Sequence, residues 1–208
     1  MTLAGLVPWL DYASVLVFAL TGALVASRAQ LDLVGFIFFA TLTGIGGGTV
    51  RDLLIGAPVF WITDPWVAAV CLGTALIAWF TPVRWWEGKG FDYADGAGLA
   101  AYAVLGSAKA LAYGIPPVPA ALMGVITGCV GGIFRDVVAG RPSIIMSPEL
   151  YVTPAALSAA LTVAGVMVAP WLGVDDAWAW GLGFVCGFAL RTAAIRWEWG
   201  LPSYGERA

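Results

Sequence analysis

The strongest chemical signal in the sequence is a Gly-Gly-x-x-Arg-Asp motif that occurs twice within long apolar segments. The first copy ends a stretch from Thr43 to Asp52 and the second a stretch from Thr127 to Asp136, with six of ten aligned residues identical. A charged side chain within a membrane span costs about 2.5–3.5 kcal/mol on insertion scales. Two copies of an adjacent Arg-Asp pair therefore indicate charge pairing and a polar pathway.

The glycines of the motif predict unwound backbone. Each glycine costs about 1 kcal/mol of helix propensity relative to alanine, and glycine reaches backbone angles that other residues avoid. A break would free carbonyl groups that lipid cannot satisfy and that are natural ligands for a dehydrating cation. We therefore expect breaks at Gly46-Gly47-Gly48 and at Gly131-Gly132. A transported monovalent cation would bind the carbonyls of Gly46, Gly47 and Gly131.

The charged residues of the motif would complete the pathway. Asp52 and Asp136 would attract cations, while Arg51 and Arg135 would hold those carboxylates and the broken helix ends in place. Thr49 stands three residues before Asp52, which is the capping-box spacing, so it would cap the half-helix after the first break. The second copy has an isoleucine at the matching position, so its break must be capped in another way.

Two plainer interpretations of the motif remain open. The patterns Gly44-x-x-x-Gly48 and Gly124-x-x-x-Gly128-x-x-x-Gly132 are typical of helices that pack closely in membranes. The Arg-Asp pairs could also be structural ion pairs that tie helices together. Adjacent residues point about 100° apart on a helix, so their partners could lie on other helices.

Lys109 is the other charge within an expected span, and it follows Ser107 by two residues. As a functional residue, Lys109 would place a positive charge in the outer vestibule near Asp52, where the membrane field could move it and gate a pore. Ser107 is the second gating candidate. The plainer interpretation of Lys109 is a side chain that extends to the membrane surface from the outer end of its helix.

The composition indicates that the elements that position these residues are membrane helices. Of the 208 residues, 61% are hydrophobic and 11% are charged, whereas about 25% are charged in soluble domains. A soluble fold of this composition would expose a large apolar surface and aggregate. Histidine is absent, which excludes His-based triads, His-ligated metals and histidine proton relays. The three cysteines lack metal-ligand spacing, and we expect neither an enzyme nor a resident cofactor.

Charge-free windows predict an all-α membrane protein with a single transmembrane domain over residues 1–208. The seven expected spans are 12–27, 33–55, 66–83, 91–113, 118–139, 150–168 and 178–195. Repeat one covers about residues 11–83, repeat two about 91–169, and the seventh helix about 176–196. Because each repeat holds three spans, the second must insert upside down, an inverted three-plus-three plan found in transport proteins.

The repeats align at an offset of 84 residues, which also pairs Gly22 with Gly106. A small insertion or deletion would pair Asp11 with Asp92. The similarity between the two repeats therefore extends beyond the motif to the span that precedes it in each repeat.

Lysine and arginine residues predict the orientation. Seven of them fall on the side of the C-terminus, whereas Arg51 and Lys109 fall on the other side. By the positive-inside rule the N-terminus is outside and the C-terminus is cytoplasmic. The first ten residues lack a basic residue and do not form a secretory signal.

Partner classes also follow from the basic residues. The ten basic residues are spread along the chain, so nucleic-acid binding is not expected. Some cytoplasmic basic residues could hold anionic head groups of membrane lipids, although topology charges are the plainer interpretation: Arg28, Arg84, Lys89 and Arg141.

The sequence resembles the trimeric intracellular cation (TRIC) channel family over about residues 11–199. The resemblance rests on the stretch from Gly46 to Gly56, on its second copy from Gly131 to Arg141, and on Lys109 in Gly-Ser-Ala-Lys. It implies seven spans, an inverted repeat, and a homotrimer with a pore for monovalent cations, chiefly potassium, in each subunit. It also implies that the glycine motifs line the pore and that Lys109 acts in gating. The short tail after the last span resembles prokaryotic members of the plasma (inner) membrane.

Two other functions remain open. Prokaryotic sequences of this type have also been described as small-solute transporters, especially for glycine. A structural membrane protein without transport activity would account for the glycines but not for the repeated charges. The motif does not encode a choice between potassium and sodium.

Overall fold

The structure, a computed structural model, describes residues 3–85, 89–146 and 149–201. The described residues are almost entirely helical. In chain order the α-helices are α1 (Leu3–Arg28), α2 (Leu33–Leu54), α3 (Phe60–Thr63), α4 (Pro65–Phe80), α5 (Lys89–Ala112), α6 (Pro117–Val138), α7 (Val152–Leu172) and α8 (Ala177–Trp197). Two single-turn 3-10 helices, η1 (Val83–Trp85) and η2 (Ile144–Met146), lie in connections.

The long helices coincide with the expected spans. Five of those described are long and apolar enough to cross a membrane: Trp9–Arg28 of α1, α2, α6, α7 and α8. α4 has 16 residues and is shorter, while α5 carries Asp92, Asp95 and Lys109. The short helix α3, after α2, was not expected. The chain is thus an all-helical membrane protein, as its composition predicts.

Local sequence signals set the helix ends. Asp32 begins α2 by accepting a hydrogen bond from the Gly35 N–H at 2.9 Å, and Asp64 begins α4 by accepting one from the Trp66 N–H at 3.0 Å. α2 and α6 both end before a glycine of positive φ, 67° at Gly56 and 65° at Gly140. These two glycines are repeat equivalents, so both motif helices end in the same left-handed turn.

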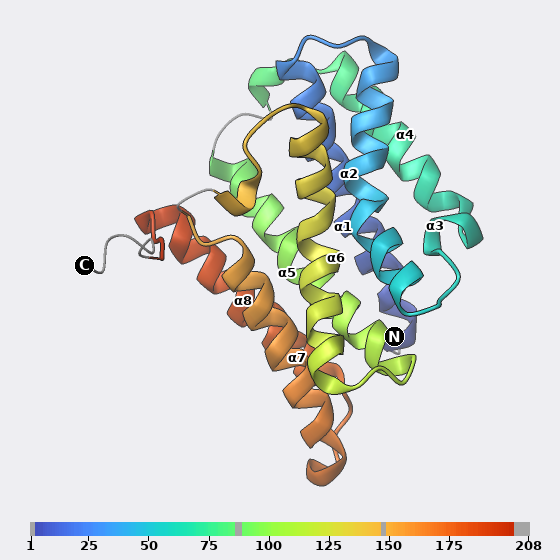
Figure 1. Cartoon of the computed structure of the whole chain (residues 1–208), viewed down its shortest axis with the longest axis vertical. Coiled ribbons are helices and arrows are strands. Elements are labelled where there is room, and N and C mark those ends of the chain that lie inside the picture. Colours follow the sequence, from blue (N-terminus) through green and yellow to red (C-terminus); the bar gives the residue numbers. More distant parts are fainter. Residues whose placement is uncertain (1–2, 86–88, 147–148, 202–208) are drawn as a thin grey trace.

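Figure 1 shows α2 and α6 side by side at the centre of the bundle, running in opposite directions. α1 packs on α2 and α5 packs on α6, so each repeat contributes one such pair. α4 packs on α1 and α2 at one edge of the bundle, whereas α7 and α8 pack together at the other edge (Figure 1). The two glycine motifs therefore meet in the middle of the molecule.

The core is built from small residues and a few aromatic rings, whereas the periphery is apolar. Phe18 is fully buried, while Phe80 and Trp171 are 78% and 89% exposed. Such exposed apolar side chains are expected where a helix faces lipid. Of the basic residues that predicted the orientation, Arg207 and the side chain of Lys89 lie outside the described residues.

Candidate functional site

α2 and α6 cross in close contact at the glycine motifs. A Cβ atom on Gly47 would lie 2.2 Å from the carbonyl oxygen of Thr127, and one on Gly131 would lie 2.4 Å from that of Thr43. Thr43 and Gly47 are the repeat equivalents of Thr127 and Gly131, so the two contacts are reciprocal. Only glycine allows this approach. The interpretation of the small residues as close helix packing is therefore confirmed.

The remaining motif glycines also face neighbouring groups. A Cβ atom on Gly46 would lie 3.2 Å from the ring of Phe134, and one on Gly48 would lie 2.6 Å from the ring of Phe60. Gly132 is buried. Each of the three consecutive glycines in the first motif therefore lies next to a different neighbouring residue.

Neither motif helix breaks at its glycines. α2 and α6 are continuous α-helices, so the expected unwound segments are wrong for this conformation. The absence of a side chain permits unusual backbone angles, but it equally permits a close helix crossing. A continuous helix also satisfies its interior N–H and carbonyl groups, which lipid would leave unpaired. Unwinding therefore does not free the carbonyls of Gly46, Gly47 and Gly131 for a cation.

Thr49 likewise does not cap a half-helix. Its hydroxyl donates to the carbonyl of Ile45 at 2.7 Å and accepts the indole N–H of Trp61 at 3.0 Å. Thr49 thereby ties α3 to α2. The capping-box assignment is wrong because the helix is not interrupted before Thr49.

Asp52 lies near the C-terminal end of α2 at the centre of a group of charges, here called the Asp52 cluster (Asp11, Arg51, Asp52 and Lys109). Its Oδ1 forms ion pairs with Arg51 Nε and Lys109 Nζ, each at 2.8 Å, and its Oδ2 accepts a hydrogen bond from the Phe60 N–H at 2.9 Å. Asp11 on α1 interacts electrostatically with the other three charges. Two cations thus balance two carboxylates. The expected proximity of Lys109 to Asp52 is confirmed.

Arg135 and Asp136 form a matching pair near the C-terminal end of α6. Arg135 Nε donates to Asp136 Oδ1 at 2.8 Å, the same atoms and distance as in the first motif. In both motifs the arginine side chain therefore pairs with the carboxylate of the residue that follows it in the sequence. This pair opens onto a cavity of about 220 Å³, here called the Asp136 cavity. Its other charged lining residues are Arg28, Asp92, Asp95, Arg141 and Arg191.

The two Arg-Asp pairs lie toward opposite ends of the helix crossing. The reciprocal glycine contacts centre the crossing near residues 45 and 129. Asp52 and Asp136 each follow that centre by two helical turns, or about 10 Å at a rise of 1.5 Å per residue. The charges are therefore displaced from the middle of the bundle toward its two ends.

The two ends differ at one pair of repeat-equivalent positions. Lys109 occupies the Asp52 cluster, and the offset of 84 residues places Val25 at the matching position of the first repeat. Val25 lines the Asp136 cavity and supplies no charge there. The Asp52 end is closed by a lysine–carboxylate pair, whereas the Asp136 end keeps a polar cavity.

Packed side chains close the interior between the two ends. Phe18 on α1 stacks on Tyr102 of α5 with ring centroids 5.2 Å apart, and the Tyr102 hydroxyl donates to the carbonyl of Gly44 at 2.9 Å. Ser107 is fully buried, and its hydroxyl donates within its own helix. A Cβ atom on Gly124 would lie 3.0 Å from the Ser107 Oγ, so Ser107 lies at the contact of α5 with α6.

Three residues that the sequence motifs do not identify complete the charge groups. Asp11 accompanies Arg51 at one end, while Asp95 interacts electrostatically with Arg135 and Arg191 at the other. The constant offset of 84 pairs Asp11 with Asp95 directly, so the insertion that would pair Asp11 with an earlier aspartate is unnecessary. Arg191 comes from α8, outside both repeats, and no repeat signal could identify it.

Known proteins are similar to this chain over nearly its whole length. A family model described as glycine transporter matches residues 8–82 and 92–167, one match in each repeat. The chain is 34% identical to the UPF0126 inner membrane protein YadS of Escherichia coli strain K12 over 215 residues, which cover 96% of each chain.

Two solved structures share the fold. The TRIC trimeric intracellular cation channel orthologue from Rhodobacter sphaeroides is 38% identical with a TM-score of 0.82, covering 93% of this chain and 99% of that one. A second solved structure, which concerns the structural basis for conductance through TRIC cation channels, is 28% identical to this chain with a TM-score of 0.83. The match covers 94% of this chain and 96% of that one. These similarities identify the chain as a multi-pass inner-membrane protein with the fold of these TRIC structures, and not as an enzyme.

Proposed function

The chain belongs to the glycine transporter family of membrane proteins, and from this premise we propose that it conducts monovalent cations passively, like the TRIC cation channels it resembles. The observation that carries the proposal is the placement of a carboxylate and its arginine near each end of the α2–α6 crossing. A carboxylate attracts cations, so Asp52 and Asp136 mark the two entrances. Arg51 and Arg135 hold these carboxylates in position.

The proposed pathway runs from the Asp136 cavity past the middle of the bundle to the Asp52 cluster. The stacked rings of Phe18 and Tyr102 and the Lys109–Asp52 pair close it in this conformation. Opening requires both barriers to move. Gly46 to Gly48 contribute no side chain of their own to their contacts with α6 and α3, so we place the required shift of α2 at these residues. Gly131 and Gly132 would serve the same purpose on α6.

Lys109 is the proposed gate at the Asp52 end. Its ammonium group is paired with Asp52 and its side chain is 28% exposed, so the ammonium group can leave Asp52 for solvent without crossing the core. Moving one charge across the full membrane potential is worth about 2.3 kcal/mol per 100 mV. An energy of that size is comparable with the contribution of one charged hydrogen bond, about 1.5–3 kcal/mol. Ser107 would act indirectly, by holding α5 against α6.

The proposed topology has seven spans, with α4 and α5 crossing the membrane beside the five apolar helices. The reciprocal contacts of Gly47 and Gly131 are those expected of two repeats related by a two-fold axis in the membrane plane. These contacts support an inverted three-plus-three arrangement with α8 added. The excess of basic residues at the C-terminal side supports a topology with the N-terminus outside and the C-terminus in the cytoplasm.

The assembly is proposed to be a homotrimer with one pathway in each subunit and potassium as its main ion. The Rhodobacter sphaeroides relative is described as trimeric, and a single chain brings both Arg-Asp pairs to the two ends of one helix crossing. The gradient and the membrane potential supply the driving force, so no cofactor is required. The cytoplasmic basic residues would contact anionic membrane lipids.

A second candidate function is transport of a small zwitterion such as glycine, as the family description suggests. The Asp136 cavity favours this alternative in one respect, because both carboxylates and guanidinium groups line it. A zwitterion needs partners of both signs, which a cation does not.

Flux into proteoliposomes separates the two functions. The channel predicts rubidium uptake that rises linearly with rubidium concentration and is insensitive to glycine. Saturable uptake of radiolabelled glycine, with no rubidium flux, would establish the transporter instead. Empty liposomes and protein carrying Asp52→Asn and Asp136→Asn together serve as controls.

A further inference from the structure

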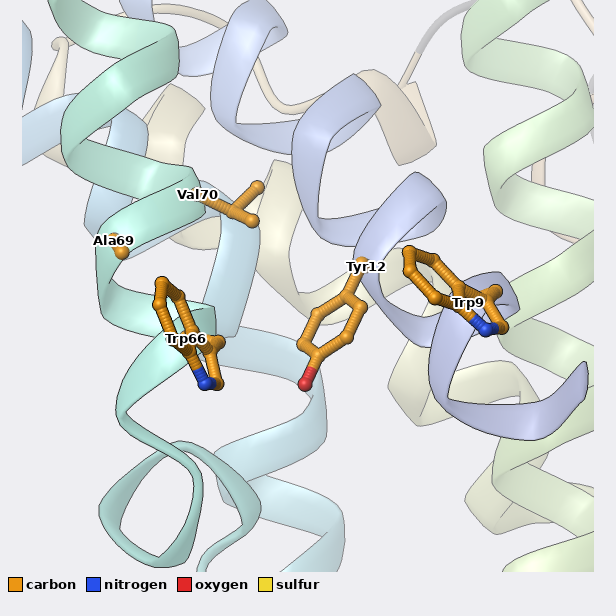
Figure 2. A pocket seen from close by; sticks show the side chains of 5 residues that line it. All are labelled: Trp9, Tyr12, Trp66, Ala69 and Val70. Atoms are coloured by element: carbon orange, nitrogen blue, oxygen red, sulfur yellow. The ribbon is translucent and has the colours of Figure 1, made fainter. Parts of the chain in front are cut away.

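A groove lined by aromatic side chains lies between the N-terminal parts of α1 and α4. It has a volume of about 680 Å³ and is lined by Trp9 and Tyr12 of α1 and by Trp66, Ala69 and Val70 of α4. Figure 2 shows Trp66 and Tyr12 facing each other across a gap, with Trp9 beyond Tyr12. Trp9 and Trp66 are 64% and 70% exposed, so the groove opens to the surface of the bundle.

The groove has a polar end and an apolar end. In Figure 2 the Tyr12 hydroxyl and the Trp66 indole nitrogen point toward one end, whereas Ala69 and Val70 lie at the other. α4 lies at the edge of the bundle (Figure 1), where lipid would surround it. Tryptophan and tyrosine are enriched where a membrane meets water. The groove therefore has the polarity of a lipid molecule, with a head-group end and a chain end.

A carboxylate marks the polar end. Asp64 Oδ2 accepts the Tyr12 hydroxyl at 2.5 Å, and Oδ1 accepts the Trp66 N–H at 3.0 Å. Among the described residues no lysine or arginine lies within 4.0 Å of this carboxylate. Both hydrogen bonds come from neutral donors, so the negative charge of Asp64 is not cancelled. The Tyr12 phenol that donates to it also becomes more electron-rich, which strengthens the attraction of its ring face for a cation.

We propose that this groove binds the ammonium head group of a membrane lipid, as found in phosphatidylethanolamine or phosphatidylcholine. Aromatic rings that surround a position near a carboxylate recognise alkylammonium groups by cation–π attraction and charge. Ala69 and Val70 would contact the glycerol and the first part of the acyl chains. Phosphatidylglycerol lacks the ammonium group that this arrangement recognises, and the Asp64 charge would repel its anionic head group.

Native mass spectrometry of the purified full chain, titrated with lipid, tests this proposal. Phosphatidylethanolamine and phosphatidylglycerol with identical acyl chains are compared, so that only the head group differs. We expect the wild-type chain to retain phosphatidylethanolamine preferentially. Trp66→Leu and Asp64→Asn should each weaken that binding by about 3- to 30-fold, the range of one cation–π contact or a comparable charge contact. Binding of phosphatidylglycerol should not fall.

Matched variants separate a binding role from a structural one. Asn is as good an N-cap as Asp, so Asp64→Asn should leave α4 and the yield of folded protein unchanged. Trp171→Leu removes a tryptophan that is 89% exposed at the end of α7 and should leave lipid binding unchanged. Tyr12→Phe keeps the ring and should weaken binding by about two- to threefold, less than Trp66→Leu.

Three results would overturn the proposal. The first is equal retention of the two lipids by the wild-type chain. The second is retention of phosphatidylethanolamine that Trp66→Leu and Asp64→Asn leave unchanged, which would reduce Asp64 to a helix cap. The third is binding of tetramethylammonium chloride without any lipid preference, which would assign the groove to a free organic cation.

Discussion

Lys109 Nζ on α5 lies 2.8 Å from Asp52 Oδ1 on α2, and this ion pair joins the two repeats at one end of the bundle. The Asp52 carboxylate is fully buried and keeps two further donors, Arg51 Nε and the Phe60 N–H. Loss of Lys109 would therefore separate the repeats at this end without leaving Asp52 unpaired. This arrangement suits a side chain that moves during gating.

Lys109→Ala should favour the open state. The substitution removes one charged hydrogen bond from the closed state, worth about 1.5–3 kcal/mol, so the ratio of open to closed times should rise about tenfold or more. Lys109→Arg retains the charge and should keep most of the gating. Single-channel recording gives the ratio, and the yield of folded protein is measured beside it. A collapse in yield with normal gating of the surviving protein would make Lys109 a structural residue.

Val25→Lys should create a second lysine gate at the Asp136 end. Val25 is the repeat equivalent of Lys109 and lines the Asp136 cavity, so a lysine there can reach Asp136 as Lys109 reaches Asp52. We expect lower open probability, or a current at least about twofold smaller, because the added cation repels permeant ions at this entrance. Val25→Leu adds bulk without charge and is the control. Equal currents from the lysine and leucine variants would argue against a pathway through this cavity.

Asp136→Asn should lower cation conductance. Asn retains an oxygen that can accept the Arg135 hydrogen bond but removes the negative charge from the cavity. We expect a reduction of about two- to threefold at 0.1 M salt and a smaller one at 1 M, where the screening length falls from about 10 Å to about 3 Å. Asp175→Asn, at an exposed position before α8, should have no such effect. A conductance independent of Asp136 at both salt concentrations would exclude it from the pathway.

Gly47→Ala should destabilise the folded protein. The added Cβ would lie 2.2 Å from the Thr127 carbonyl oxygen, and overpacking of this kind typically costs about 1–3 kcal/mol. Gly73→Ala on α4 meets nothing within 4 Å and should be neutral or stabilising by up to about 1 kcal/mol, because alanine favours helices. Thermal unfolding in detergent compares the two variants. Equal melting temperatures would contradict the close crossing of α2 and α6.

Sequence patterns predicted the long helices and the proximity of Lys109 to Asp52. Charge-free windows locate the long helices because lipid excludes charge. The repeat offset also pairs Gly56 with Gly140, the two glycines of positive φ that follow the motif helices.

The conformation of the glycine motifs could not be predicted in the same way. The missing side chain of Gly47 permits either an unwound helix or a close neighbour, and only the position of the Thr127 carbonyl decides between them. Arg191 was missed for a different reason. It reaches the Asp136 cavity from α8, which has no counterpart in the repeat, so its contribution depends on tertiary packing alone.

The central claim is that the chain conducts monovalent cations through a pathway within each subunit. Purified protein in a planar bilayer, with a tenfold potassium chloride gradient, tests it most directly. The account predicts unitary current steps that reverse near the potassium equilibrium potential. Steps that reverse near the chloride equilibrium potential, or saturable glycine uptake by the same preparation without any steps, would contradict it.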